Sequence, residues 1–251
     1  MKIAIGGFDG VHIAHQELIR KADKVVIIEK GSSLTPGFDR LEYIKKPFDF
    51  LILEKIKDLS ALEFIEYLKK LNASCVIVGE DFKFGKNRSG DINTLKKYFK
   101  VEVIKEIKIE NTGVHAKVIR KFIREGNIKK ANTFLGRNYK IKGMQIKGQG
   151  LGSKELVPTI NIEPLKPYTI PKPGVYATFT NSAPSVTFIG TRSTDDNFSI
   201  ETHILSPFKE QKLISIEFFD LIREIKKFSS LNELKKAIFE DIKKAKSILD
   251  I

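Results

Sequence analysis

Residues 6–15 read Gly-Gly-Phe-Asp-Gly-Val-His-Ile-Ala-His and contain two of the four histidines in the chain, His12 and His15. The segment lies between a predicted strand and a predicted helix that starts near Ile13. Glycines let a backbone approach a ligand closely, and the N-terminus of a helix favours anions. Imidazoles three residues apart face the same way, so this pair can stabilise charge that develops on a phosphate. The segment therefore predicts a phosphate-binding turn.

Other interpretations of the histidine pair have less support. A zinc site would need a third ligand, and none is evident near the pair. The spacing matches neither the G-x-G-x-x-G run of dinucleotide-binding folds nor the G-K-[ST] run of the P-loop. Histidines three residues apart are often surface residues. Two of only four histidines beside one glycine-rich turn nevertheless favour a functional site.

A second group of polar residues lies in the other half of the chain. Thr159 and Asn161 are two positions apart, as are Glu201 and His203, so each pair faces one side of a strand. A lone glutamate on a strand is usually exposed, and a Pro-Thr-x-Asn run is usually a turn, so neither pair identifies a site by itself. Three glycines just before the first pair suit close approach of the backbone to a phosphate: Gly148, Gly150 and Gly152.

Strands and helices alternate in the first half of the chain, which favours a parallel sheet with helices on its faces. The glycine-rich turn follows the first strand, where open sheets of this kind bind their ligands. The predicted strands are residues 2–6, 25–29, 48–54, 76–79 and 101–104, and the predicted helices are residues 13–22, 61–71, 91–99, 114–124 and 128–135.

The pattern changes after Gly136. Six short runs of period-2 or β-branched residues, separated by turn residues, predict an antiparallel barrel or sandwich. These runs are residues 139–146, 159–162, 175–180, 186–190, 199–205 and 213–218. A final helix over residues 231–249 has an apolar stripe. We therefore expect two domains, residues 1–135 and residues 136–251.

Composition sets broad limits on the class of protein. The chain has 251 residues, of which 41% are hydrophobic and 30% charged, and its mean hydropathy is −0.17. These values exclude a wholly disordered chain. No apolar run approaches the ~20 residues of a membrane span, and no signal peptide precedes the first strand, so a cytoplasmic protein is expected. The single cysteine, Cys75, lies in an apolar run and excludes an intramolecular disulfide.

The net charge of +13 favours an anionic partner, but it does not by itself identify which one. Only eight of the 44 basic residues are arginine, and the lysines are spread along the whole chain. Most lysine pairs fall on predicted helices, where a solvated face explains them. A nucleic-acid-binding protein remains an alternative, and it predicts binding that weakens steeply as the salt concentration rises. The absence of tryptophan and of basic runs interleaved with aromatics argues against it.

Several motifs in one order resemble the bacterial bifunctional riboflavin kinase/FMN adenylyltransferases, also called FAD synthetases. Residues 6–15 resemble the G-x-F-D-G-x-H-x-G-H stretch of that family, and Pro158–Asn161 resembles its P-T-A-N motif. The further matching segments are Gly79–Gly85, Arg120–Gly126, Ala131–Tyr139, Gly174–Tyr176, Gly190–Arg192, Glu201 with His203, and Arg223–Phe228. The resemblance covers nearly the full length of the chain.

For the first half, the resemblance implies a Rossmann-like nucleotidyltransferase domain that adenylylates FMN with ATP to give FAD and pyrophosphate. His12 and His15 would be catalytic and stabilise the ATP phosphates. The residues implied to bind ATP are Gly7, Phe8, Asp9, Gly10, Lys117 and Arg120, and those implied to lie near the flavin are Asp81, Phe82 and Phe84.

For the second half, the resemblance implies a β-barrel riboflavin kinase with a terminal helix, which transfers the γ-phosphoryl group of ATP to riboflavin. Glu201 would be the general base, and Thr159 and Asn161 would hold Mg²⁺. Arg223 would reach the flavin or the nucleotide. The residues implied to bind ATP are Gly148, Gly150, Gly152 and Asn161. The implied partners are thus ATP, riboflavin and FMN, with neither a membrane nor a nucleic acid.

Three departures from the family pattern affect the first half. Ala14 replaces the glycine between the histidines, and the T-F-x-P-H-P segment after the second strand is shortened to residues 27–33. The I-S-S-T-x-I-R motif aligns with residues 114–120, where His115, Ala116 and Lys117 replace the three hydroxyl residues. Lys117 and His115 could supply charge in place of the hydroxyl donors. The alternative is a protein that is a riboflavin kinase only, with a structural first half.

Overall fold

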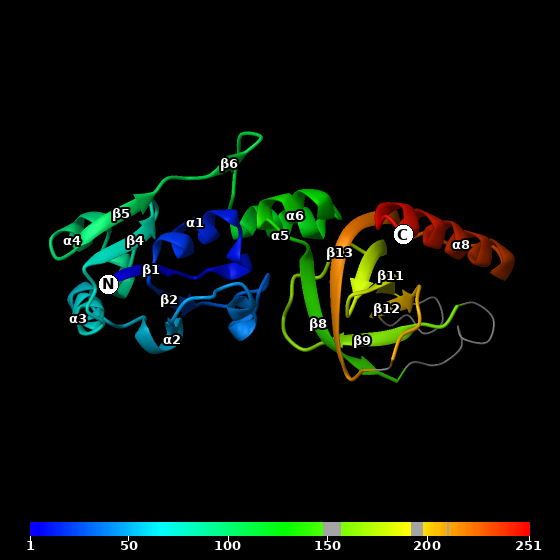
Figure 1. Ribbon diagram of the computed structural model, residues 1–251, viewed down its shortest axis with the longest axis horizontal. Coiled ribbons are helices and arrows are strands. Elements are labelled where there is room, and N and C mark those ends of the chain that lie inside the picture. Colours follow the sequence, from blue (N-terminus) through cyan, green and yellow to red (C-terminus); the bar gives the residue numbers. More distant parts are fainter. Residues whose placement is uncertain (148–156, 192–197, 210) are drawn as a thin grey trace. The chain divides into compact units, whose positions relative to one another are not determined.

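The computed structural model describes residues 1–147, 157–191, 198–209 and 211–251. The chain forms two compact units, Met1–Val118 and Ile119–Ile251, and each is described by itself (Figure 1). Among the described residues, no helix combines the length and the apolar character needed to cross a membrane.

The first unit is built on a five-stranded parallel sheet with the order β3-β2-β1-β4-β5. Strands β2 and β3 are added on one side of β1, and β4 and β5 are added on its other side. The carboxyl ends of β1 and β4 therefore flank a topological switch point. The strands are β1 (Lys2–Gly6), β2 (Lys24–Glu29), β3 (Phe48–Ile52), β4 (Cys75–Gly79) and β5 (Lys100–Ile104). A two-stranded hairpin, β6 (Lys108–Ile109) and β7 (Thr112–Gly113), follows β5.

Helices cover both faces of this sheet, as the alternating sequence pattern predicts. On one face, Ile3 and Ile5 pack with Phe64 and Leu68. On the other face, Ala4 packs among the apolar residues of the helix that follows the glycine-rich turn. The helices are α1 (Ile13–Lys21), α2 (Leu53–Ile56), α3 (Ala61–Lys70) and α4 (Ile92–Lys96), and the 3₁₀ turns are η1 (Asp9–Val11), η2 (Gly37–Glu42) and η3 (Lys86–Arg88).

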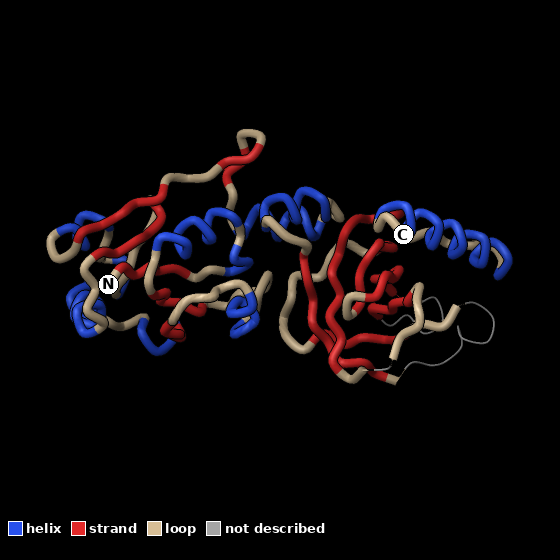
Figure 2. Tube along the Cα trace, in the orientation of Figure 1, coloured by secondary structure: helices blue, strands red, loops and turns tan. Residues whose placement is uncertain are grey.

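The second unit contains a closed barrel with the strand order β10-β11-β12-β9-β8-β13. Its strands are red in Figure 2. Every neighbouring pair is antiparallel. The strands are β8 (Tyr139–Ile146), β9 (Ile160–Pro164), β10 (Gly174–Thr180), β11 (Ala183–Thr191), β12 (Phe198–Ile204) and β13 (Leu213–Glu224). Helix α8 (Leu231–Ile248) packs on the outside of the barrel, against β10, β11 and β13.

Two kinds of side chain fill the interior of the barrel. Among the apolar ones, Ile141, Ile216 and Phe218 are fully buried. Beside them, five fully buried hydroxyl residues bond to one another over distances of 2.7–3.1 Å. These are Thr178, Thr180, Ser185, Thr187 and Thr202. Because each hydroxyl has a partner, the network avoids the cost of burying unsatisfied polar groups.

Two helices precede the barrel in sequence. Helix α5 (Ala116–Arg124) contains the point at which the two units divide, and α6 (Ile128–Leu135) packs on β8 and β13. Asn132 links α6 to the barrel, since its amide donates to the Phe218 carbonyl at 2.8 Å and accepts the Tyr139 N–H at 2.8 Å. The compact units therefore divide at Val118, before α6, while the division of the functional halves near Gly136 stays a prediction.

The predicted fold class is confirmed, with differences at the ends of elements. The strand expected over residues 48–54 ends at Ile52, where α2 begins, and the helix expected from Val114 begins at Ala116. The last strand runs on to Glu224 rather than ending at Phe218. Two irregularities in its pairing with β10 bend it without ending it, and such bulges leave no period-2 signal.

Candidate functional site

The glycine-rich turn of the first unit brings the two histidine rings together. His12 is the N-cap of α1, and its Nδ1 accepts the backbone N–H of His15 at 3.4 Å. The rings stack with centroids 3.5 Å apart, and the Phe8 ring meets His15 edge-on at 5.3 Å. Because Nδ1 of His12 is an acceptor, the proton of its neutral ring lies on Nε2. His12 can therefore donate a hydrogen bond to an anion from Nε2.

Backbone strain is concentrated in this turn. Phe8 and Val11 have φ angles of 50° and 40°, in the left-handed region that side chains other than glycine rarely adopt. Val11 is β-branched and fully buried, so its conformation is an outlier that the surrounding structure must impose. Gly10, with φ of 83°, takes the same region without strain. Strain of this kind is often found where a backbone is shaped for a ligand.

The segment after β2 is bonded to this turn. The Asp9 carboxylate accepts the backbone N–H groups of Leu34 and Thr35 at 2.9 and 3.1 Å. The Gly10 N–H in turn donates to the Thr35 hydroxyl at 2.8 Å. These bonds show that Asp9, implied to bind ATP, also shapes the wall of the site.

A fully buried arginine makes a second link that sequence reasoning missed. The Arg40 guanidinium donates to the Gly7 carbonyl and forms an ion pair with Glu29, and it lies over the Phe50 ring at 5.6 Å. Glu29 also accepts the backbone N–H groups of Gly31 and Ser32. No local pattern marks Arg40 as different from the other arginines, because its partners are distant in sequence.

The electrostatics of the turn keep His15 neutral. Burial first, and then neighbouring cations, lower the pKa of His15 well below its ordinary value of 6.5. The neighbours that lower the pKa of His15 after burial are, in order, His12, Arg40, Lys30 and His115. His15 is therefore uncharged at neutral pH, and its buried Nδ1 has no hydrogen-bond partner among the described residues.

The residues implied to lie near the flavin follow β4, which pairs with β1 in the sheet. Asp81 is exposed, and the rings of Phe82 and Phe84 stack with centroids 5.7 Å apart. Phe84 is buried against Phe64 at 5.4 Å, so it is a core residue as well. Because β1 and β4 are parallel neighbours, this loop and the histidine turn leave the same edge of the sheet.

The altered motif before and within α5 presents three basic residues in different settings. His115 is exposed, and its Nε2 lies 2.8 Å from the Glu106 carboxylate. That hydrogen bond lowers the pKa of Glu106. Lys117 is exposed in the first turn of α5, and Arg120 lies on the same helix within the second unit.

In the second unit, the barrel places the predicted kinase residues side by side. Glu201 on β12 pairs with Asn161 on β9, so both side chains lie on one face of the sheet. The Ser199 hydroxyl donates to Glu201 Oε1 at 3.0 Å. Thr159 is exposed just before β9, two residues from Asn161. The carboxylate thus comes from β12, and the two oxygen-bearing side chains come from the start of the neighbouring β9 and the residue just before it.

His203 holds the segment that carries Thr159. Its Nδ1 lies 2.8 Å from the Pro158 carbonyl oxygen, which can only accept, so Nδ1 carries a proton. The strand ladder ends with the pair Thr202–Ile160. The imidazole therefore ties down the chain one step beyond the last backbone pair.

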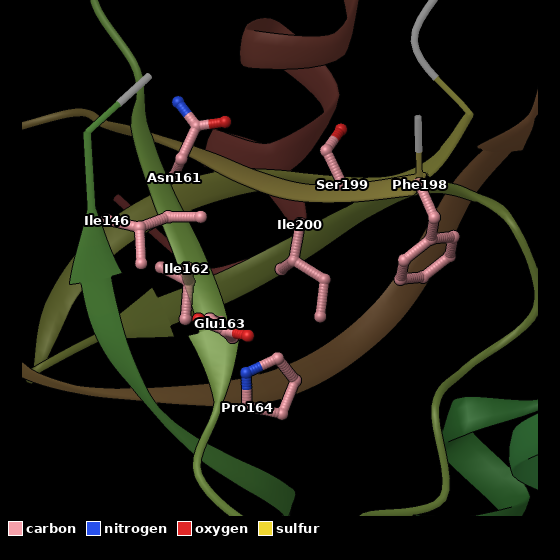
Figure 3. A pocket seen from close by; sticks show the side chains of 8 residues that line it. All are labelled: Ile146, Asn161, Ile162, Glu163, Pro164, Phe198, Ser199 and Ile200. Atoms are coloured by element: carbon pink, nitrogen blue, oxygen red, sulfur yellow. The ribbon is translucent and has the colours of Figure 1, made fainter. Parts of the chain in front are cut away.

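A cavity of about 350 Å³ lies between the ends of β8, β9 and β12. Figure 3 shows Asn161 and Ser199 pointing to one side of the strands and Phe198 and Ile200 to the other. The lining combines a few polar groups with apolar side chains, as in small-molecule sites. The lining residues are Ile146, Asn161, Ile162, Glu163, Pro164, Phe198, Ser199 and Ile200.

Arg223 is bound within the protein. Its guanidinium makes three hydrogen bonds of 2.8–3.0 Å to the Asp241 carboxylate of α8, and it lies over the Phe228 ring at 5.4 Å. These bonds occupy much of its donor capacity. The glycines implied to bind ATP in this half, Gly148, Gly150 and Gly152, lie outside the described residues.

Comparisons with known proteins agree with both halves. A family model described as FAD synthetase matches residues 29–120, and one described as riboflavin kinase matches residues 135–249. A solved structure described as a macrolide-efflux protein from Streptococcus pneumoniae has a TM-score of 0.83 at 24% identity, covering 96% of this chain and 92% of that chain. At that identity the likeness shows a shared fold.

Two bifunctional riboflavin kinase/FMN adenylyltransferases are each 30% identical to this chain. The protein from Buchnera aphidicola subsp. Acyrthosiphon pisum aligns over 96% of this chain and 90% of its own length. The protein from Listeria monocytogenes aligns over 89% of this chain and 79% of its own length. With two family models in the expected order and relatives matched over both halves, this chain belongs to the family of bifunctional riboflavin kinase/FMN adenylyltransferases.

Proposed function

We propose that the C-terminal half phosphorylates riboflavin with ATP and that the N-terminal half adenylylates FMN with a second ATP. The functional halves divide near Gly136. The observation that carries this proposal is the presence of two separate sites, each at the place that its fold uses for ligands. Membership of the family supplies the substrates, which are riboflavin, ATP and FMN. Because these substrates occur in the cytoplasm, we expect the enzyme to work there.

In the kinase half, Glu201 is the proposed general base. The 5′-hydroxyl oxygen of riboflavin attacks the γ-phosphorus of ATP, and the bond from that phosphorus to the bridging oxygen breaks. The hydroxyl proton passes to the Glu201 carboxylate, which Ser199 orients by its hydrogen bond. ADP leaves with the electron pair of the broken bond. The cavity beside Asn161 offers apolar walls on which a flat flavin or purine ring can pack.

The kinase half also fits a magnesium ion. Thr159 and Asn161 carry oxygen atoms, and Mg²⁺ usually takes one or two protein oxygens together with phosphates and water. Thr159 is exposed and Asn161 is half-buried, so both can be reached by an ATP phosphate. When bound there, the ion supplies neutralisation of phosphate charge. His203 would keep Thr159 in place through its bond to Pro158.

In the other half, an oxygen of the FMN phosphate attacks the α-phosphorus of ATP, and pyrophosphate leaves with the electrons of the broken bridging bond. The FMN phosphate is mostly a dianion at neutral pH, so the step needs no base. His12 is placed to donate from Nε2 to a phosphate oxygen, and neutral His15 stacks against it. Catalysis then rests on positioning and on neutralising charge.

One assay tests both activities in the same chain. Riboflavin, ATP and Mg²⁺ are incubated with the protein, and FMN and FAD are separated by chromatography. Glu201→Gln is expected to abolish FMN formation and leave FAD formation from added FMN unchanged. His12→Asn keeps an N-cap acceptor. It is expected to abolish FAD formation from added FMN and leave FMN formation unchanged. Wild-type protein that makes FMN but no FAD, even from added FMN, would establish a riboflavin kinase only.

A further inference from the structure

The segment that follows β2 carries a lysine, Lys30, beside the glycine-rich turn. The residues on either side of it are firmly bound. Before it, the Glu29 carboxylate accepts backbone N–H groups at 2.9 Å and pairs with Arg40. After it, the backbone at Leu34 is bonded to Asp9. These bonds fix where the Lys30 side chain starts and limit where it can reach.

The Lys30 side chain runs over the start of the turn. A Cβ atom added to Gly7 would lie 3.3 Å from Lys30 Cε, so the aliphatic stem passes directly above that glycine. Its charge also reaches the histidine pair, where it is one of the cations acting on His15. Within the described chain, no carboxylate lies within ion-pair distance of the Lys30 ammonium group. The group therefore stands beside the turn with its charge available.

We propose that Lys30 binds a phosphate oxyanion in the adenylyl-transfer site, at the mouth of the turn formed by Gly7 and its neighbours. The inference rests on the proposed adenylyltransferase activity and names a residue for it that the motif comparison does not supply. An ammonium group is a compact charge on a flexible stem, which suits a phosphate oxygen. Both substrates of the reaction carry such oxygens, ATP in its triphosphate and FMN in its 5′-phosphate.

Arg40 supports this arrangement without taking the ligand. It holds the Gly7 carbonyl just after β1 and the Glu29 carboxylate at the end of β2, the two groups that flank Lys30. Being fully buried, it serves as the anchor, while Lys30 is exposed and can meet a substrate. The lysine and the arginine thus have separate tasks in one short segment.

The test compares Lys30→Gln with a matched control, Lys55→Gln, which removes the same charge from an exposed position of α2. FAD formation from added FMN is measured while ATP and FMN are varied in turn. We expect kcat/KM of Lys30→Gln to fall about 10- to 100-fold, the effect of losing a hydrogen bond from a charged group. The control should match wild type, and FMN formation by the kinase half should be unchanged in both.

The two sources of phosphate give different results. A rise in KM for ATP alone places Lys30 at the triphosphate, and a rise in KM for FMN alone places it at the flavin phosphate. Either result supports the proposal, and Lys30→Arg should recover part of the loss. Lys30→Gln kinetics equal to those of Lys55→Gln would overturn it.

Failure of the proposed activity can be told apart from failure of this inference. Wild-type protein that makes no FAD refutes adenylyl transfer. Calorimetric titration with inorganic pyrophosphate then decides the role of Lys30 without turnover. Weaker binding by Lys30→Gln than by Lys55→Gln supports a phosphate contact, and equal binding overturns it. Circular dichroism of both variants checks that the fold is intact.

Discussion

Helix α8 is expected to depend on one ion pair for its place on the barrel. Asp241 is 5% exposed, and its carboxylate accepts three hydrogen bonds of 2.8–3.0 Å from Arg223 of β13. An apolar contact accompanies the pair, in which Ala245, Leu249 and the half-buried Ile248 pack against residues of the barrel. Replacing Asp241 by Asn removes the charge while keeping the volume.

The size of the effect follows from the burial of the two partners. Removing one member of a fully buried pair costs about 3–5 kcal/mol, because the other charge is left without its partner. The Arg223 side chain keeps 23% exposure, so water recovers part of that cost. We therefore expect Asp241→Asn to destabilise the docked helix by about 2–3 kcal/mol.

Hydrogen exchange of the α8 amides, read by mass spectrometry, measures this loss directly. A change of about 2–3 kcal/mol in local opening lowers amide protection by about 30- to 150-fold. Glu240→Gln is the control, because it neutralises the exposed neighbour on the same helix. Protection in Asp241→Asn equal to that in the control would refute the reasoning. A raised KM for riboflavin with unchanged protection would instead give Arg223 the flavin-binding role that the motif comparison implies.

Three further results are expected. Arg40→Met leaves the Gly7 carbonyl and the Glu29 carboxylate without their buried partner. We expect it to lower the free energy of unfolding of the first unit by about 2–4 kcal/mol. Urea unfolding, monitored by hydrogen exchange of the β1 and β2 amides, measures this loss. His15 binds a proton more weakly in the folded than in the unfolded state. Its contribution to stability is therefore complete above about pH 6.5 and falls on acidification. When the pH is lowered from 7.5 to 5.5, the Tm of the first unit should drop less in His15→Gln than in wild type. Thr187→Val breaks the bonds to Thr178 and Thr202, and thermal melts should show a loss of about 1–3 kcal/mol in the barrel, against no loss for a valine at the exposed Thr191.

Local patterns were enough to predict most of the fold. Alternation of strands and helices indicated the parallel sheet, and the change to short period-2 runs after Gly136 indicated an antiparallel barrel or sandwich, of which the structure shows the barrel. Both follow from which faces must be buried, and that information lies within each element. The ends of elements were less predictable, as at Ile52 and Glu224, because packing and bulges decide where a strand stops.

Some features of the candidate sites could likewise be predicted from the sequence, and others could not. Residues that follow a strand or alternate along one, such as His12 and Asn161, could be placed from the sequence. The contacts of Arg40 with Gly7, and of Arg223 with Asp241, join positions 33 and 18 residues apart. No periodicity links such positions, so the anchoring role of Arg40 and the internal pairing of Arg223 become visible only in three dimensions.

The structure of the first unit bears on whether the chain is bifunctional. The shortened segment after β2 and the lost hydroxyl residues at positions 115–117 would suit a domain that has kept its fold and lost its chemistry. In such a domain, no function would maintain local features that lower stability. Val11 is held in a strained conformation, a charged pair is buried at Arg40, and His15 is kept neutral among cations, all around one turn. Apolar residues could replace the buried pair at little loss, and a glycine could relieve the strain. Their concentration at the turn predicted to bind phosphate therefore favours adenylyl transfer over a structural role.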